Sequence, residues 1–503
     1  MRRPVVLITG SSGGLGRALC TAFSRRGWTV VGHARTLAAV PSGLPAVAAD
    51  LRHPEAAAEI VTQLQGLGLA PDVLVCNAGL GHFGPPAGLT PDIVDALLEV
   101  NVWSAIALTH ALLPMLRQRR GAVAFVSSVA AAVPAPDYAL YAATKAGLDG
   151  FARNLRIELA GQVDVLSLWP GGVRTPMHAR SGVPAERSDA WRLAEAAAVA
   201  NAMADRISAR RSSALGIGPT LTRWAGRNLE GLIDRALTRQ IANVPDAGIE
   251  PRSVLVTGAA DGIGLALVRA YVATGASVVG VDVDVQRAAA AETALGPGLR
   301  ILTADLSERA ALTQVSAALL DAGPYDIVIQ NAGISAVGAF AESDLAAQRR
   351  VFDVNLRAPL QLSVALLAGR GLRPGARLGF LSSLSLYVGY PGAAVYAATK
   401  DGLAHFARSL DAALRPTGTT ALRIHPGPTR TAHAARYSPD NRREARRMAP
   451  DTLAAHIVRA LERRERVLIP GLANRAFAEL GRWAPGLTER LLKRSLLDKM
   501  PGS

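Results

Sequence analysis

Two pairs of residues in this chain combine a tyrosine and a lysine at a spacing of four. Tyr141 precedes Lys145, and Tyr396 precedes Lys400, each within the sequence YAATK. Side chains four residues apart lie on one face of a helix, so the ammonium group can sit near the phenol and lower its pKa. A phenol tuned in this way can donate a proton to a carbonyl oxygen or accept one from an alcohol. The pattern predicts acid–base chemistry at an oxygen atom.

The composition supports a special role for these two lysines. The 503 residues carry a formal net charge of +15, yet only four of the 55 basic residues are lysines. Two of those four occupy the YAATK positions, in a chain that otherwise uses arginine. A compact ammonium can reach both a phenol and a ribose where a wide guanidinium does not fit. For an isolated pair, a buried tyrosine beside a solvated lysine would be the better interpretation.

A glycine pattern follows a short apolar segment at two places. Glycines at this spacing permit a tight turn and close approach to a pyrophosphate, while the next helix points its N-terminal amides at the phosphates. A lone pattern would equally suit an ordinary strand-to-helix turn. Its recurrence directly after a predicted strand favours dinucleotide binding. The glycines are Gly10, Gly14 and Gly16, and again Gly258, Gly262 and Gly264.

Six motifs recur in the same order at nearly one offset, between 248 and 256 residues. VVLITG returns as SVLVTG, VLVCNAG as IVIQNAG, LEVNV as FDVNL, FVSS as FLSS, YAATK unchanged, and WPGGVRT as HPGPTRT. The chain is therefore two homologous halves, with predicted domains 1–245 and 246–503. Short apolar segments alternate with helical ones in each half. This alternation predicts an α/β protein with two Rossmann-type, doubly wound parallel sheets and helices on both faces.

Together these motifs resemble the short-chain dehydrogenase/reductase family, over nearly the whole chain and twice, so the chain is similar to a tandem fusion of two such domains. The resemblance implies that the two tyrosines are the acid–base residues and that the two lysines bind the nicotinamide ribose. It implies that Ser128 and Ser383 bind the substrate oxygen and that Asn101 and Asn355 hold a proton-relay water. The further cofactor contacts that it implies are Asp50 and Asp305 at the adenine, Asn77 and Asn331 at its ribose, and Thr175 and Thr431 at the carboxamide.

The end of the second predicted strand differs between the halves. Aligning TVVGHAR with SVVGVDV places Asp282 opposite Ala34 and Val283 opposite Arg35. A carboxylate accepts hydrogen bonds from the ribose 2′-hydroxyl and repels a 2′-phosphate, whereas an arginine pairs with that phosphate. We therefore expect NADP(H) in the N-terminal half and NAD(H) in the C-terminal half. A solvated loop position for Arg35 is the alternative.

These observations predict a bifunctional oxidoreductase that interconverts secondary alcohols and ketones. The segments between the serine and the tyrosine of each half are largely apolar, which favours a hydrophobic or bulky substrate. If one half oxidises an alcohol with NAD and the other reduces the ketone with NADPH, the net reaction is an epimerisation. In the alternative, one half is catalytic and the other is a cofactor-bound structural or regulatory partner.

The remaining features concern location and partners. The two cysteines, Cys20 and Cys76, cannot form a disulfide framework or a metal site, and they indicate a cytoplasmic protein without a bound metal. The longest apolar stretches are too short to span a membrane. An aromatic-and-basic platform for nucleic acid does not occur in the sequence. We expect the halves to pair as an internal pseudo-dimer, and a homodimer of such units is left open.

The C-terminal segment carries much of the charge excess. Residues 433–503 hold 15 basic and 8 acidic residues, which is +7 of the total of +15. Residues 486–500 have the pattern of a basic amphipathic helix. We expect its apolar side to pack over an active site or on the partner half, with peripheral contact to anionic lipid as the alternative.

Overall fold

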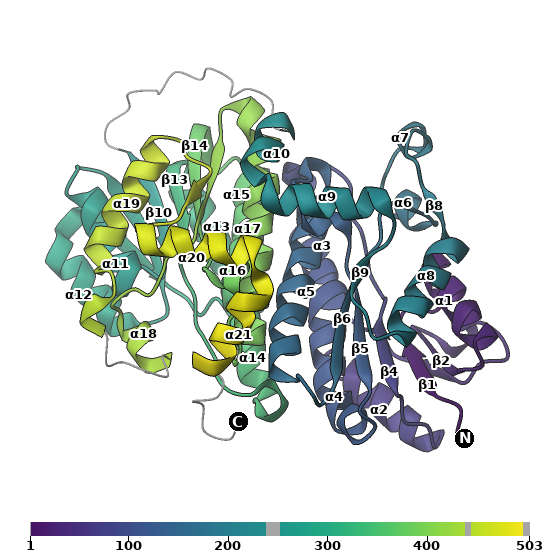
Figure 1. Ribbon diagram of the computed structural model, residues 1–503. Helices are drawn as coiled ribbons and strands as arrows, with labels where there is room; N and C mark the ends of the chain where they lie inside the picture. The colour runs from purple at the N-terminus through teal and green to yellow at the C-terminus, as the bar shows by residue number, and fades with distance from the viewer. Residues whose placement is uncertain (1, 238–251, 438–443, 496–503) are drawn as a thin grey trace.

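The computed structural model describes residues 2–237, 252–437 and 444–495 and contains two seven-stranded parallel sheets side by side (Figure 1). The strand orders are β3-β2-β1-β4-β5-β6-β9 and β12-β11-β10-β13-β14-β15-β16. In each sheet the first strand lies in the interior, and later strands are added on both sides of it. The predicted α/β fold with two doubly wound sheets is confirmed. The predicted boundary between 245 and 246 lies outside the described residues.

The two sheets are equivalent strand by strand. The first contains β1 (Val5–Ile8), β2 (Thr29–Ala34), β3 (Ala46–Ala48), β4 (Val73–Cys76), β5 (Ala122–Val126), β6 (Asp164–Trp169) and β9 (Ser213–Ala214). The second contains β10 (Ser253–Thr257), β11 (Ser277–Asp282), β12 (Leu299–Thr303), β13 (Tyr325–Gln330), β14 (Leu372–Leu381), β15 (Thr420–Ile424) and β16 (Val467–Leu468). A separate short pair is formed by β7 (Val173–Arg174) and β8 (Ala194–Glu195).

Both faces of each sheet are buried, which explains the continuous apolar sequence of the strands. Successive side chains point to opposite faces, so Val6 and Ile8 enter an outer core while Val5 and Leu7 enter an inner one. Helices on the outer faces are α1 (Gly14–Arg25), α8 (Ala196–Ser208), α11 (Gly262–Val272), α12 (Val285–Leu295) and α19 (Pro450–Glu462). Those on the inner faces are α2 (Ala56–Gly66), α3 (Pro91–Leu98), α4 (Ser104–Gln118), α5 (Ala139–Glu158), α13 (Arg309–Ala322), α14 (Leu345–Phe352), α15 (Ala358–Ala368) and α17 (Ala394–Leu414).

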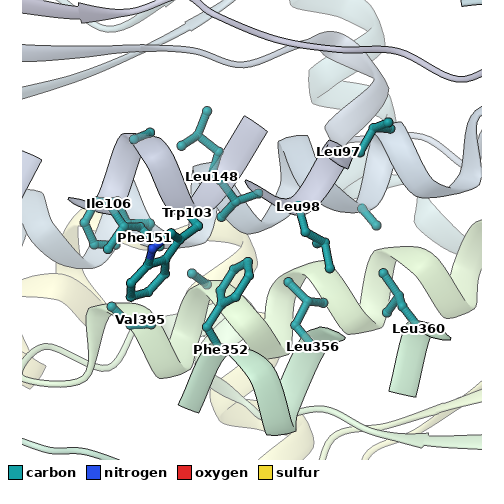
Figure 2. Packing of buried hydrophobic residues seen from close by; sticks show 14 of the residues in the cluster. Leu97, Leu98, Trp103, Ile106, Leu148, Phe151, Phe352, Leu356, Leu360 and Val395 are labelled. Atoms are coloured by element: carbon teal, nitrogen blue, oxygen red, sulfur yellow. The ribbon is translucent and has the colours of Figure 1, made fainter. Parts of the chain in front are cut away.

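The inner faces of the two sheets share one hydrophobic core, which contains residues of both halves. Figure 2 shows Trp103 and Phe151 of the first half close to Phe352 and Val395 of the second. The rings of Trp103 and Phe352 lie 5.5 Å apart between centroids. The halves are therefore joined by a dry apolar layer, which stabilises them as one folding unit.

The joint has approximate two-fold symmetry, most clearly where α5 crosses α17. A Cβ on Gly147 would lie 3.1 Å from the carbonyl oxygen of Ala398. A Cβ on Gly402 would lie 3.2 Å from the carbonyl oxygen of Ala143. These four residues form two pairs related by the offset of 255, so each half presents the same surface to the other, as in a two-fold symmetric dimer. A side chain at either position would force the two backbones apart by a few tenths of an ångström, which favours glycine here.

An ion-pair cluster flanks the apolar layer. Glu99 of the first half accepts hydrogen bonds from Arg309 at 3.1 Å and Arg349 at 2.5 Å, and also from Arg357. The side chain of Arg357 is 2% exposed, and Asp353 is a second carboxylate partner. Removing one partner from a buried ion pair strongly destabilises a protein, because the other charge is left uncompensated.

Four helices after the sheets cross the joint. In each half the chain ends in a pair of helices, and these two pairs contact each other and the opposite half. Of the predicted 486–500 helix, the described part contacts α5 of the first half, and Glu489 pairs with Arg156 there at 3.2 Å. Leu496, Lys499 and Met500 lie outside the described residues. The four helices are α9 (Ile217–Asn228), α10 (Glu230–Leu237), α20 (Leu472–Trp483) and α21 (Pro485–Ser495).

Two helical segments, Pro91–Gln118 and Leu345–Ala368, are long and apolar enough to cross a membrane by composition alone. Their most apolar windows are 78% and 83% buried within the protein. Both contribute to the shared inner core, which is consistent with a soluble fold. The short remaining helices are α6 (Met177–Arg180), α7 (Ala185–Asp189), α16 (Ser385–Val388) and α18 (Ala432–Tyr437).

Candidate active sites

The predicted site residues gather at the carboxyl ends of the strands. The glycine loops follow β1 and β10, the NAG motifs follow β4 and β13, and the two serines follow β5 and β14. The carboxyl ends of parallel strands meet at one edge of a sheet, where the strand order reverses between β1 and β4. The same holds between β10 and β13, so each half has one candidate site.

Each glycine loop has a backbone that other residues cannot adopt. Gly10 has a φ of +66° and Gly258 a φ of +65°, in the left-handed region. A Cβ on Gly16 would overlap the carbonyl oxygen of Gly10, and one on Gly264 would overlap that of Gly258. The first turn of α1 and of α11 therefore packs directly on the loop, at the position where helix N-terminal amides would bind phosphate groups.

The NAG motif is tied to the glycine loop in both halves. The Asn77 side-chain amide donates to the carbonyl oxygen of Thr9 at 2.9 Å, and the Thr9 hydroxyl accepts from the backbone N–H of Asn77 at 3.0 Å. Asn331 and Thr257 repeat both contacts at 3.0 and 2.9 Å. The two threonines thus fix the loops on which the cofactor would rest. Neither threonine was among the predicted site residues, although TG begins both glycine motifs.

A π-helical turn places the predicted asparagine of each half. Asn101 lies in the π-helix Glu99–Trp103 and Asn355 in the π-helix Asp353–Arg357. Asn101 accepts a hydrogen bond from the Leu80 N–H at 2.7 Å and donates to the Leu80 carbonyl at 2.9 Å. A π-turn inside a long helix commonly marks a functional position, because it redirects one side chain out of the regular pattern.

The asparagine and the lysine of each half converge on the NAG loop. A Cβ on Gly79 would lie 3.5 Å from both Asn101 Oδ1 and Lys145 Nζ. In the second half, a Cβ on Gly333 would lie 3.3 Å from Asn355 Oδ1 and 3.1 Å from Lys400 Nζ. A side chain at Gly333 would therefore crowd the lysine of the second half, whereas the contacts at Gly79 would be ordinary ones.

The serine, tyrosine and lysine have the same arrangement in both halves. The Lys145 ammonium donates to the carbonyl oxygen of Val126 at 2.9 Å, and Lys400 donates to Leu381 at 2.9 Å. Each ammonium lies 5.7 to 5.8 Å from the centroid of its tyrosine ring. A hydrogen bond with Ser128 lowers the pKa of Tyr141, in opposition to a larger effect of burial that raises it. Each tyrosine thus meets its serine and its lysine, as the spacing predicts.

The protonation states differ from the sequence-based expectation. Burial raises the pKa of Tyr396 to about 12, despite its hydrogen bond with Ser383. Burial also lowers the pKa of both lysines to about 8. Desolvation thus outweighs the hydrogen bond with the serine, and the lowered tyrosine pKa that we expected is wrong for this state of the protein. The phenol is held in its protonated form, ready to donate a proton.

A cavity of about 360 Å³ occupies the site of the second half. It extends from the glycine loop to Tyr396 and Lys400, a size and shape typical of a small-molecule site. Most predicted residues of this half line it, namely Gly258, Gly262, Asp282, Asp305, Asn331, Tyr396, Lys400 and Thr431. A glycine cradle at one end, a carboxylate beside it and a lysine at the other end fit a dinucleotide.

The two adenine-side acids have different partners. Asp50 accepts from the Arg52 side chain, which holds its pKa at about 2. Asp305 accepts from the Ser307 N–H and hydroxyl at 2.9 and 2.6 Å and pairs with Arg350 at 3.2 Å. Asp305 lines the cavity, and Arg350 and His433 join it there without having been predicted. These two come from α14 and α18, whose approach to the site has no local sequence signal.

The ends of β2 and β11 carry different side chains at the predicted position. Asp282 accepts hydrogen bonds from the Ala260 N–H of the glycine loop at 2.8 Å and from the Asp284 N–H at 3.1 Å. In the first half Arg35 is exposed, and Arg17 of α1 donates to the carbonyl oxygen of Ser12 at 3.0 Å. Arg17 is therefore a second cation at the glycine loop, where the repeat alignment places Leu265 in the other half.

The family model described as short chain dehydrogenase matches residues 4–184 and 252–442. The chain belongs to the short-chain dehydrogenase family. It carries two units of that family in tandem, and it is an oxidoreductase acting on CH–OH groups.

Two relatives match one family unit of this chain. Serine 3-dehydrogenase of Rhizobium radiobacter is 35% identical over 195 residues, which cover 37% of this chain and 78% of that protein. The 1-deoxy-11-beta-hydroxypentalenate dehydrogenase of Streptomyces exfoliatus is 39% identical over 188 residues, covering 36% and 68%. A crystal structure of the N-domain of a bacterial malonyl-CoA reductase with NADP spans both units. It covers 94% of this chain and 98% of its own, with a TM-score of 0.66 and 18% identity, and it shares the fold.

Proposed function

We propose that both halves are catalytic, interconverting a secondary alcohol and a ketone, and that their opposite cofactor preferences couple the two reactions. The observation that carries the proposal is a contrast between the halves. The serine, tyrosine, lysine and asparagine keep the same contacts in both halves. The side chains beside the glycine loop, in contrast, are cationic in the first half and anionic in the second. A copy retained only for structure would have no use for a buried lysine held beside a buried phenol.

The first half is the NADP(H) half of this proposal. Arg17 and Arg35 place two cations around the glycine loop, with Leu265 and Val283 at the aligned positions of the other half. Guanidinium groups pair well with a 2′-phosphate because several N–H donors can bind its oxygens at once.

The second half is the NAD(H) half. Asp261 and Asp282 line its cavity, and Gly13 and Ala34 are their counterparts in the first half. Two carboxylates near the ribose repel a 2′-phosphate and can accept hydrogen bonds from a free 2′-hydroxyl. Steady-state kcat/KM with both cofactors tests the assignment, and equal values for the two in either half would remove it.

The proposed chemistry assigns one task to each side chain. A bound nicotinamide supplies or accepts the hydride at the carbon that is reduced or oxidised. Tyr141 or Tyr396 donates its proton to the carbonyl oxygen in reduction and takes a proton from the hydroxyl in oxidation. Ser128 or Ser383 orients that oxygen, and the lysine places positive charge beside the phenol, which favours the phenolate needed for oxidation.

The surroundings of the first tyrosine favour an apolar or aromatic substrate. The Tyr138 ring lies 5.8 Å from that of Tyr141 between centroids, 5.1 Å from Phe83 and 6.5 Å from Trp191. In the second half, Tyr390 lies 6.2 Å from Tyr396. Aromatic side chains bury large apolar areas, so these walls suit a hydrophobic or bulky alcohol or ketone.

The coupled reaction would invert an alcohol. The NAD half oxidises the alcohol to a ketone, and the NADP half reduces that ketone to the opposite configuration, so the substrate undergoes no net oxidation. Two sites in one chain raise the local concentration of the shared ketone. The test is a panel of hydrophobic secondary alcohols with NAD⁺ and NADPH together, followed by chiral product analysis. Accumulation of ketone without any inverted alcohol would sink the epimerisation and leave the two dehydrogenase activities standing.

A further inference from the structure

A second cavity of about 360 Å³ lies at the joint between the halves. None of the eight serine, tyrosine, lysine and asparagine residues of the two active sites lines it. Its walls come from α5 and α17, from the segments that follow the two serines, which include α16, and from the four helices after the sheets, α9, α10, α20 and α21. A partly open cavity of this volume is large enough for a small molecule.

The cavity is built by a repeat that extends beyond the family motifs. AGRNLEGLIDRAL at 225–237 returns as LGRWAPGLTERLL at 480–492, again at an offset of 255. A Cβ on Gly226 would overlap the carbonyl oxygen of Ala132, and one on Gly481 would overlap that of Tyr387, which is the residue equivalent to Ala132. Figure 1 shows α9 and α20 approaching the joint from opposite halves. The cavity therefore lies on the approximate two-fold axis.

Positive charge dominates the lining. Seven arginines face four carboxylates, so the walls carry an excess of cations. Most of the arginines have an acidic partner: Arg223 pairs with Asp149 at 3.3 Å, and Arg482 pairs with Glu230 at 2.9 Å. Two carboxylates outside the lining, Asp234 and Glu479, also pair with Arg423 and Arg482, so one cation remains in excess among these groups.

Arg227 is the exception among these arginines. Its guanidinium donates to the carbonyl oxygen of Gly481 at 2.7 Å, and among the described residues it pairs with no carboxylate. Burial, followed by repulsion from Arg153 and Arg223, lowers its pKa to about 10. In the same wall, the Tyr387 hydroxyl is buried and has no hydrogen-bond partner among the described residues. Arg227 is exposed, so the cavity presents a solvent-accessible cation without a carboxylate partner, together with an unused donor.

The rest of the lining suits an organic group. Leu386, Val388 and Ala131 give the cavity an apolar side, and its volume exceeds what a single small ion would need. Guanidinium groups bind phosphate oxygens in a forked geometry that matches their N–H donors. We propose that the cavity at the joint binds a phosphorylated small molecule, with Arg227 as a ligand of its phosphate group.

Calorimetric titration of the full chain with phenyl phosphate, and separately with inorganic phosphate, tests the proposal. NADP⁺ and NAD⁺ are kept saturating, because both cofactor sites also bind phosphate, and chloride is used to hold the ionic strength constant. The expected result is one saturable site per chain, with phenyl phosphate binding more tightly than inorganic phosphate. Absence of saturable binding by either probe would overturn the proposal, and so would tighter binding of citrate, which would indicate a carboxylate site.

Variants then locate the site. Arg227→Ala should weaken phenyl phosphate binding at least about 10-fold, which corresponds to the loss of a charged hydrogen bond. Arg475→Ala is the matched control, because this exposed arginine of α20 also donates to one backbone carbonyl, that of Ile469 at 2.9 Å. Equal weakening in both variants would show a general charge effect and refute the assignment. If Arg227→Ala does not fold, Arg227→Lys keeps the charge and should show an intermediate affinity, whereas unchanged binding would refute the role of Arg227.

Discussion

The two candidate active sites of this chain have the same contacts among the tyrosine, lysine and serine. They differ in the charged residues beside the glycine loop, where the cofactor's ribose would bind. Around the reacting oxygen, each lysine donates to a backbone carbonyl at 2.9 Å, and each tyrosine meets its serine. Around the glycine loop, one half has Arg17 and Arg35, and the other has Asp261 and Asp282. The groups that would transfer the proton are thus shared by the halves, whereas the charges that we propose to select the cofactor differ.

The largest expected effect tests whether both sites are catalytic. Tyr141→Phe should lower the kcat of the NADP-dependent reaction by about 10²–10⁴-fold, because the proton donor is lost. Tyr396→Phe should do the same to the NAD-dependent reaction. Each variant should leave the other reaction unchanged, as measured by the absorbance of the reduced cofactor at substrate saturation.

Tyr138→Phe and Tyr390→Phe serve as controls, because these neighbours lie next to the catalytic rings without a lysine four residues on. A half whose variant retains full activity is not catalytic, and the halves would then differ in chemistry as well as in cofactor.

The next prediction concerns the ion-pair cluster around Glu99, which links the two halves. Glu99→Ala removes a carboxylate that three arginines of the second half contact, and it leaves Arg357 with less compensation in a buried position. The free energy of unfolding should fall by about 3–5 kcal/mol. Urea unfolding should still show one transition that abolishes both activities together.

The matched control is Asp205→Ala, which breaks the exposed pair with Arg26 and should cost at most about 1 kcal/mol. If Glu99→Ala separates the unfolding of the two halves into two transitions, the shared core does not hold them as one unit.

Exchanging the residues at the ends of β2 and β11 should reverse the cofactor preferences of the two halves. Ala34→Asp with Arg35→Val should move the ratio of kcat/KM for NADPH over NADH in the first half about 10–100-fold towards NADH. Asp282→Ala with Val283→Arg should move the second half in the other direction. Unchanged ratios after both exchanges would show that the charge at the end of the second strand does not decide cofactor choice.

The smallest expected effect is a dependence of stability on pH that both halves share. The folded pKa of Lys400 is lowered to about 8 from 10.5, so above pH 8 the unfolded chain binds more protons. Stability should therefore rise with pH in this window, by about 2 kcal/mol from this lysine between pH 8 and pH 10. Lys400→Met should lose that increment, whereas Arg490→Met, at an exposed arginine, should keep it. Identical urea midpoints for wild type and Lys400→Met at both pH values would contradict the shift.

The sequence was sufficient to predict the fold and the site motifs that occur in both halves. Two copies of each motif at nearly one offset predicted both sheets, and the order of the motifs placed the glycine loop, the asparagine, the serine and the YAATK helix around one edge. These inferences hold because a strand end, a helix face and a glycine turn are local features that a few residues determine.

The protonation of the site was beyond the sequence. The spacing of Tyr141 and Lys145 suggested a lowered phenol pKa, but burial of the phenol raises it, and burial depends on every segment that covers the site. Arg350 and His433 were likewise missed, because α14 and α18 bring them to the cofactor cavity from distant parts of the chain.

The sequence by itself thus determined a tandem pair of similar units and the residues that can move a proton in each. Only the tertiary structure decided how the units meet. The inner faces of both sheets are apolar, and neither can remain exposed to water, so they merge into one core across α5 and α17. That merger brings the tail helices together and creates the arginine-lined cavity, whose walls come from segments more than 250 residues apart.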